Sequence, residues 1–156
     1  MYRHLLGAVA LTALAACAGG DVVRKTPPEG YLQDAPARVA AVDWSTAQTV
    51  EVALSEYAFT PAVLTFEAGK PYRLLLRNDG SSAHTFASMG FFQAIAAQKL
   101  VSGAGEETLP YVESIEVPSG GSKELYFVAA RAGSFPLECS VFLHDAFGMT
   151  GEITVR

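Results

Sequence analysis

Short segments in which hydrophobic and polar residues alternate, each followed by a turn, run through the chain from about residue 46 to its end. In residues 49–54, for example, Val50, Val52 and Leu54 alternate with polar or small residues. This pattern predicts a strand, because successive side chains of a strand point to opposite faces of a sheet. The same pattern predicts strands at 63–66, 72–76, 112–117, 123–128, 134–139 and 151–155. About eight such strands favour an all-β fold, a Greek-key β-sandwich of antiparallel strands.

One segment, residues 90–101, departs from this alternation. Its apolar residues recur at positions i, i+3, i+4 and i+8, and they are Phe92, Ile95, Ala96 and Leu100. This spacing is typical of one face of a helix. We therefore expect one short inserted helix here, which either covers the sandwich or serves as a docking element for a partner.

The first 16 residues have the layout of an export signal. A basic start, with Arg3 and His4, precedes an apolar stretch from Leu5 to Ala16, and about twelve apolar residues are too few to span a bilayer. The stretch ends in Leu-Ala-Ala-Cys, which resembles the bacterial lipobox. This resemblance implies a lipoprotein signal peptide over 1–16 and a lipid attached to Cys17. The alternative is an ordinary secretory signal followed by an incidental Cys.

Residues 18–40 are rich in Pro, Gly, Ala and charged residues and show no sustained period of two or 3.6. We therefore expect residues 17–45 to form a lipid anchor and flexible tether, and residues 46–156 to form one domain. The protein would be exported and attached to a bacterial membrane, facing the periplasm. Ala18, rather than Asp, after the lipidated Cys favours the outer membrane.

The charge of the chain argues against one class of partner. The formal net charge is −5 at pH 7, and removal of the signal with Arg3 changes it to about −6. An acidic protein of this kind is a poor ligand for nucleic acid. We expect a monomer that does not bind nucleic acid.

Cys, His and Met recur every five residues near the end of the chain, as Cys139, His144 and Met149. A thiolate, an imidazole and a thioether suit a metal that cycles between Cu(I) and Cu(II), whereas zinc more commonly takes carboxylates, imidazoles or several thiolates. His84 supplies the second imidazole that a trigonal copper site needs. If Cys17 is lipidated, Cys139 has no disulfide partner, and a metal would protect its thiol. The alternative is an inert Cys buried on a strand.

The motif as a whole resembles the type 1 copper site of the cupredoxin family. A His follows an Asn-Asp-Gly turn, and Cys-x4-His-x4-Met then closes into Gly-x-Ile-x-Val, with the loop spacing of rusticyanin-like and phytocyanin-like members. The resemblance covers about residues 49–156. It implies one copper ion, with His84 and His144 as imidazole ligands, Cys139 as the thiolate with the short bond and Met149 as the weak axial ligand. It also implies a blue copper protein that transfers electrons to transient redox partners and is not an enzyme.

Other residues near this motif are candidates for supporting roles. Asn78, Thr85 and Ser140 are the nearest candidates for hydrogen bonds that orient the ligands, although ordinary turn chemistry is an equal alternative for Asn78. The apolar residues around the loop His are Phe142, Leu143, Ala146 and Phe147. If that His reaches the surface, as it does in the family, they form a docking patch for redox partners or shield copper from water. Relatives usually have Pro-Gly where this chain has Phe-Leu before the loop His.

Three other functions compete with electron transfer. A copper carrier would need exchangeable Cu(I), typically from exposed Met and His, and Met89 is the only spare candidate. A copper enzyme would need further copper sites built from additional His, and a binuclear centre would need two Cys in the loop. A metal-free lipoprotein with the same fold is disfavoured by the intact ligand set.

Overall fold

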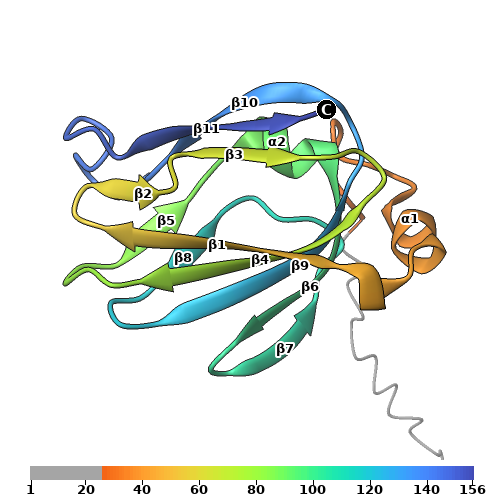
Figure 1. Cartoon of the computed structure of the whole chain (residues 1–156), viewed down its shortest axis with the longest axis horizontal. Helices are drawn as coiled ribbons and strands as arrows, with labels where there is room; N and C mark the ends of the chain where they lie inside the picture. Colours follow the sequence, from red (N-terminus) through yellow and green to blue (C-terminus); the bar gives the residue numbers. More distant parts are fainter. Residues whose placement is uncertain (1–25) are drawn as a thin grey trace, which may run out of the picture.

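Three sheets form the framework of residues 26–156, the part of the chain that this computed structural model describes. The largest sheet has the order β2-β1-β4-β9-β6-β7, and its strands are β1 (Gln48–Ser55), β2 (Ala58–Thr60), β4 (Pro71–Asn78), β6 (Ile95–Ser102), β7 (Gly105–Thr108) and β9 (Ser122–Ala129). The second has the order β10-β11-β3, with β3 (Val63–Phe66), β10 (Gly133–Glu138) and β11 (Thr150–Val155). The third pairs β5 (His84–Phe86) with β8 (Ile115–Val117). Figure 1 shows β3, β10 and β11 above β1, β4 and β9, so the predicted all-β sandwich is confirmed.

The strand directions are mixed, which corrects the expectation of an antiparallel sandwich. β1 runs parallel to β4, and β11 runs parallel to β3. The reason lies in the connection between β1 and β4, because β3 comes between them in sequence and belongs to the other sheet. The chain crosses to the second layer and returns, and a crossover of this kind lets two neighbouring strands run the same way.

The core lies between the layers and is built by the alternation seen in the sequence. In β4, Tyr72, Leu74 and Leu76 are all at most 2% exposed. The rings of Phe66, Phe91 and Phe127 pack against one another with centroids 5.2 to 5.5 Å apart. These rings join the two layers, because Phe66 belongs to β3 and Phe127 to β9.

The predicted helix over 90–101 is wrong for its second half. The helix α2 spans only Met89–Ala94, and β6 begins at Ile95. The sequence hides this strand because the register of β6 against β9 shifts between Ala97 and Lys99. Such a bulge breaks the period of two, since the apolar residues on either side of it no longer alternate. α2 contacts β10 and β6, in keeping with the expected covering role.

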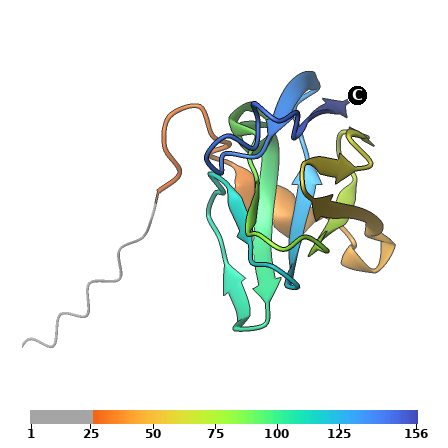
Figure 2. The ribbon, with the colours of Figure 1, turned by 90° about the vertical axis from the view of Figure 1, so that its left-hand side faces the viewer.

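The predicted tether is wrong for residues 31–45, which pack onto the large sheet. The helix α1 (Ala35–Ala41) lies against β6, and the short 3-10 helix η1 (Trp44–Thr46) follows it (Figure 2). Leu32 and Ala35 are buried against Ala96 and Val128. The segment contacts the sheet through Leu32, the short helix α1 and Trp44, so no single period runs through it. The predicted signal peptide and Cys17 lie outside the described residues. Within the described part, no helix is long and apolar enough to cross a membrane.

Candidate metal centre

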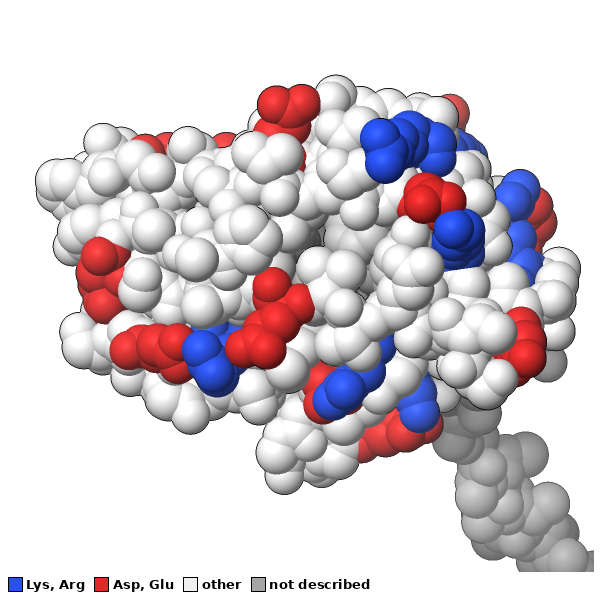
Figure 3. All heavy atoms as spheres, in the orientation of Figure 1, with Lys and Arg blue, Asp and Glu red and all other residues white. Residues whose placement is uncertain are grey.

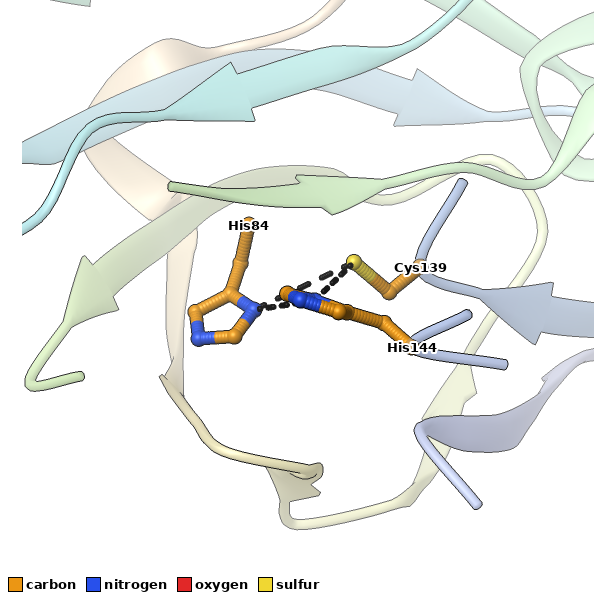
Figure 4. Close-up of side chains that lie close together, drawn as sticks. All are labelled: His84, Cys139 and His144. Carbon is orange, nitrogen blue, oxygen red and sulfur yellow. Dashed lines mark hydrogen bonds between the residues drawn. The ribbon is translucent and has the colours of Figure 1, made fainter. Parts of the chain in front are cut away.

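His84, Cys139 and His144 meet at one end of the sandwich, and their ligating atoms all lie within 4.8 Å of one another. His84 is the first residue of β5, Cys139 directly follows β10, and His144 lies in the loop between β10 and β11. The Nδ1 atoms of the two imidazoles are 3.2 Å apart. Cys139 Sγ lies 3.9 Å from Nδ1 of His84 and 3.5 Å from Nδ1 of His144 (Figure 4). Both rings therefore turn the same nitrogen towards the sulfur.

The three side chains are buried, so their polar atoms need partners other than water. His84 and Cys139 are 0% exposed, and His144 is 8% exposed. Two imidazoles and a thiol buried together are costly unless they share a proton or bind a metal. Imidazole suits copper, zinc, iron and nickel, and thiolate suits soft metals such as Cu(I). This donor set fits a trigonal copper site.

The loop between β4 and β5 places His84. Asn78, at the end of β4, is 1% exposed. Its Nδ2 donates hydrogen bonds to the carbonyls of Ser82 and Val117, at 2.8 and 2.9 Å, and its Oδ1 accepts one from the N–H of Gly80. These bonds fix the turn before His84, so Asn78 can position His84 through the backbone.

The Cys139 sulfur accepts a hydrogen bond from the backbone N–H of Thr85 at 3.3 Å. Thr85 thus contacts Cys139 through its backbone and not its hydroxyl. An N–H aimed at a thiolate stabilises the negative charge on sulfur. Ser140, by contrast, is exposed, and within residues 26–156 no hydrogen bond joins its side chain to the three site residues.

Backbone hydrogen bonds tie Met149 to the same cluster. The N–H of Cys139 donates to the Met149 carbonyl at 3.1 Å, and the N–H of Met149 donates to the His144 carbonyl at 3.0 Å. The Met149 side chain is 0% exposed and belongs to the same apolar core as Cys139. Its role as a metal ligand stays a prediction.

Leu143, which precedes His144, has a φ of +66°. Among residues 26–156 it is the only non-glycine residue with a positive φ. Glycine adopts this conformation readily, whereas a side chain with a Cβ does so at a cost. The Phe-Leu pair before the loop His thus places a leucine in a conformation that glycine adopts more readily.

Two functional candidates that the sequence did not suggest lie in the turn between β1 and β2. Glu56 Oε1 is 3.5 Å from Nε2 of His84, a buried nitrogen that makes no hydrogen bond. Glu56 also accepts hydrogen bonds from the N–H groups of Ser81 and Ser82, at 2.9 and 2.7 Å. Nothing in the sequence marks this residue, because polar residues are common in turns and it lies 28 positions before His84.

The electrostatics of this pair can be read from its surroundings. The pKa of the Glu56 carboxyl is lowered to about 2, chiefly because the Ser82 N–H donates to it, so Glu56 is ionised at neutral pH. The pKa of His84 is lowered, chiefly by burial. The Glu56 charge opposes that shift and His144 reinforces it. The neutral imidazole that a metal requires is therefore the favoured form.

The second candidate in this turn, Tyr57, packs on the loop. Its ring lies 5.0 Å from that of His144 and 4.9 Å from that of Phe147, measured between centroids. The four residues of the predicted docking patch are exposed around it, with Phe142 at 85%, Phe147 at 61% and Leu143 at 46%, and Ala146 also exposed. The exposed residues on both sides of His144 in the loop are thus mostly apolar, with Asp145 as the exception.

Solved structures share this fold at low sequence identity. The chain matches auracyanin B with 21% identity and a TM-score of 0.50, over 74% of this chain and 93% of that one. It matches a multicopper oxidase from Campylobacter jejuni with 14% identity and a TM-score of 0.56, over 74% of this chain. The match spans only 31% of the oxidase, so the likeness concerns one part of that enzyme.

Sequence comparison finds a relative of higher identity. The copper-resistant cuproprotein CopI of Rubrivivax gelatinosus is 29% identical over 112 residues, which is 70% of this chain and 67% of CopI. The family model of the cupredoxin-like domain matches residues 34–155 and so includes α1, in agreement with the packing of that helix. From this match, together with the sandwich and the buried His-Cys-His cluster, the chain belongs to the cupredoxin-like family.

Proposed function

We propose that this protein binds one copper ion through His84, Cys139, His144 and Met149 and transfers single electrons outside the cytoplasm. The observation that carries the proposal is the convergence of two Nδ1 atoms and one sulfur in a buried site. Membership of the cupredoxin-like family and the copper named in its relative CopI support the choice of metal.

The protein's own part in electron transfer is to keep the ligands still. Copper, when bound, supplies the one-electron couple between Cu(I) and Cu(II). His84 is fixed by β5 and the turn that Asn78 organises, and Cys139 by the end of β10 and the N–H of Thr85. A donor set held by packed strands moves little when the metal changes charge, and small movements favour fast electron transfer.

The route for electrons would pass through the exposed residues beside His144. His144 is the least buried site residue, and the predicted docking patch of Phe142, Leu143, Ala146 and Phe147 lies around it. On the face shown in Figure 3, residues without charge predominate at this end of the molecule, with several acidic residues beside them. A small apolar patch suits brief contact with a redox partner, because it binds without the specificity of fixed ion pairs.

Attachment and location follow from the N-terminal sequence. We propose an exported protein, lipid-anchored through Cys17 to a bacterial membrane and facing the periplasm, with the outer membrane favoured. Monomeric behaviour and the absence of nucleic-acid binding are part of this proposal. The packing of residues 31–45 would shorten the tether and hold the domain closer to its anchor.

The strongest competing function is copper storage or delivery without electron transfer. The name of CopI, a copper-resistant cuproprotein, favours this candidate. The complete burial of His84 and Cys139 argues against it, since a carrier needs ligands that a receiving protein can reach. An enzymatic function is disfavoured because both His of residues 26–156 belong to the one cluster, which leaves none for a further copper site.

The visible spectrum of the purified protein with Cu(II) tests the proposal. We expect an intense thiolate-to-copper band that disappears in Cys139→Ala and persists in Ser140→Ala, an exposed neighbour. The band should bleach with ascorbate and return with ferricyanide. Met149→Leu should keep the band and raise the reduction potential, because a weak donor to Cu(II) is removed. Absence of the band in the unmutated protein refutes the proposal, and a band that does not cycle favours the carrier.

A further inference from the structure

The contact between Glu56 and His84 suggests a role that neither the motif nor the relatives assign. A His that ligates a metal through Nδ1 carries its proton on Nε2, because the ligating nitrogen must be free. In this site Nδ1 of His84 faces Cys139 and His144. The proton-bearing Nε2 is therefore the atom on the opposite side of the ring, which is buried and makes no hydrogen bond.

Glu56 is placed to receive that proton's hydrogen bond. Its Oε1 lies 3.5 Å from Nε2, so a shift of about half an ångström would complete a bond of ordinary length. A carboxylate that accepts from the outer nitrogen of a ligating His fixes its tautomer and ring orientation and raises its basicity. The carboxylate is itself fixed by the N–H groups of Ser81 and Ser82.

Gly80 provides a second, independent observation. A Cβ added there would lie 2.6 Å from Glu56 Oε2 and 2.9 Å from His84 Nε2. Both are closer than side-chain carbons approach other atoms. The backbone thus comes near the pair only because this residue is glycine, and any larger residue would wedge the carboxylate and the imidazole apart.

We infer that Glu56 is the positioning residue for His84: it holds the imidazole with Nδ1 facing the metal, and its negative charge stabilises Cu(II) over Cu(I). The inference rests on the proposed copper site for its second part only. The orientation of His84 is a property of the metal-free protein and can be measured there.

The first experiment uses the full metal-free chain and the imidazole nitrogen signals of His84 in ¹⁵N NMR. The unmutated protein should show the form with its proton on Nε2. Gly80→Ala, which keeps the charge but separates the pair, and Glu56→Ala should both populate the other tautomer. Glu107→Ala, which removes a carboxylate from the edge strand β7, should leave His84 unchanged. An unchanged tautomer in both Gly80→Ala and Glu56→Ala overturns the positioning role.

The second experiment measures the reduction potential of the copper-loaded protein. Glu56→Gln removes the charge at nearly constant volume and should lower the Cu(II)/Cu(I) ratio at a fixed applied potential by about three- to tenfold, as expected for a partly solvated charge near the metal. Glu56→Asp should restore part of the ratio. Glu107→Gln, on the edge strand β7, removes an equal charge far from the site and should leave it unchanged. If Glu56→Gln and the unmutated protein have equal Cu(II)/Cu(I) ratios at the same applied potential, the electrostatic role of Glu56 is refuted. Failure of the unmutated protein to bind copper would refute the proposed function and leave the NMR test intact.

Discussion

Tyr57 stands edge-on against the ring of His144, with the ring planes at 71° and the centroids 5.0 Å apart. The same tyrosine packs on Phe147 at 4.9 Å and is 40% exposed. The turn between β1 and β2 therefore contacts both His of the site, through Glu56 on one and Tyr57 on the other. A segment of ordinary turn composition thereby supports the loop that carries most of the predicted ligands.

Replacement of Tyr57 by Ala should lower the free energy of unfolding of the metal-free protein by about 1 kcal/mol, because an edge-to-face aromatic pair contributes about 0.5 to 1.5 kcal/mol. Tyr57→Phe keeps the ring and should stay near the unmutated value. Urea denaturation of both variants checks this expectation. Equal losses in the two variants would mean that the hydroxyl, and not the ring contact, matters.

Leu143→Gly should raise the free energy of unfolding by up to about 1 kcal/mol, since the left-handed conformation costs a residue with a Cβ about 1 to 2 kcal/mol and the extra freedom of glycine in the unfolded chain offsets part of the gain. The matched control is Phe142→Gly, at the exposed neighbouring position without a positive φ. This variant should lower the free energy of unfolding. Thermal unfolding of the two variants distinguishes them. A loss of stability in Leu143→Gly would show that the leucine side chain outweighs its backbone conformation.

Leu32→Ala should lower the free energy of unfolding by about 2 to 3 kcal/mol, as for other buried leucines. Leu32 is 5% exposed and packs with Ala35, Ala96 and Val128, which makes the segment before β1 part of the domain. Glu29→Ala, at an exposed position in the same segment, should have little effect. If both variants match the unmutated protein in guanidinium denaturation, residues 31–45 are a tether after all.

The pairing of Arg73 with Glu124 should make stability depend on pH. Arg73 donates to Glu124 through Nε at 2.8 Å and Nη2 at 2.6 Å, and these bonds hold the pKa of the Glu124 carboxyl below its usual value. A lowered pKa contributes stability that is complete above the unfolded value of about 4.3 and is lost as the pH falls through the folded value. Glu124→Gln should therefore be less stable at pH 7 by at most about 1 kcal/mol, because the pair is partly exposed.

That difference should shrink as the pH is lowered from 5 to below the folded pKa of Glu124. Urea denaturation of the variant and the unmutated protein at several pH values measures it. A difference that stays constant over this range would assign the effect to lost packing and not to the charge.

The strands and the site residues were predictable where a single local signal suffices. Val52 and Leu54 alternate cleanly in β1, and the regular spacing of Cys139, His144 and Met149 needs no knowledge of the fold. The structure brings the two His and Cys139 together as the motif implied.

What could not be predicted depends on contacts between distant segments. The strand β6 was hidden by its bulge near Ala97, and α1 has too few turns to show a period. Glu56 becomes significant only when the β1–β2 turn and the β4–β5 loop are seen side by side. The sequence around such a residue does not indicate its role, because the role depends on which distant residue it contacts in the fold and not on its own type.

The site joins parts of the chain that are otherwise far apart. His84 belongs to the small sheet of β5 and β8, whereas Cys139 and His144 follow β10, and they lie 55 and 60 positions further along the chain. A copper ion bound by all three would link the β5-β8 sheet to the β10-β11-β3 sheet. The energy of metal binding would then add to the energy of folding, so that resistance to heat and denaturant would rise with the concentration of free copper. In a compartment depleted of copper, the same protein would unfold more readily and would therefore be degraded faster by proteases.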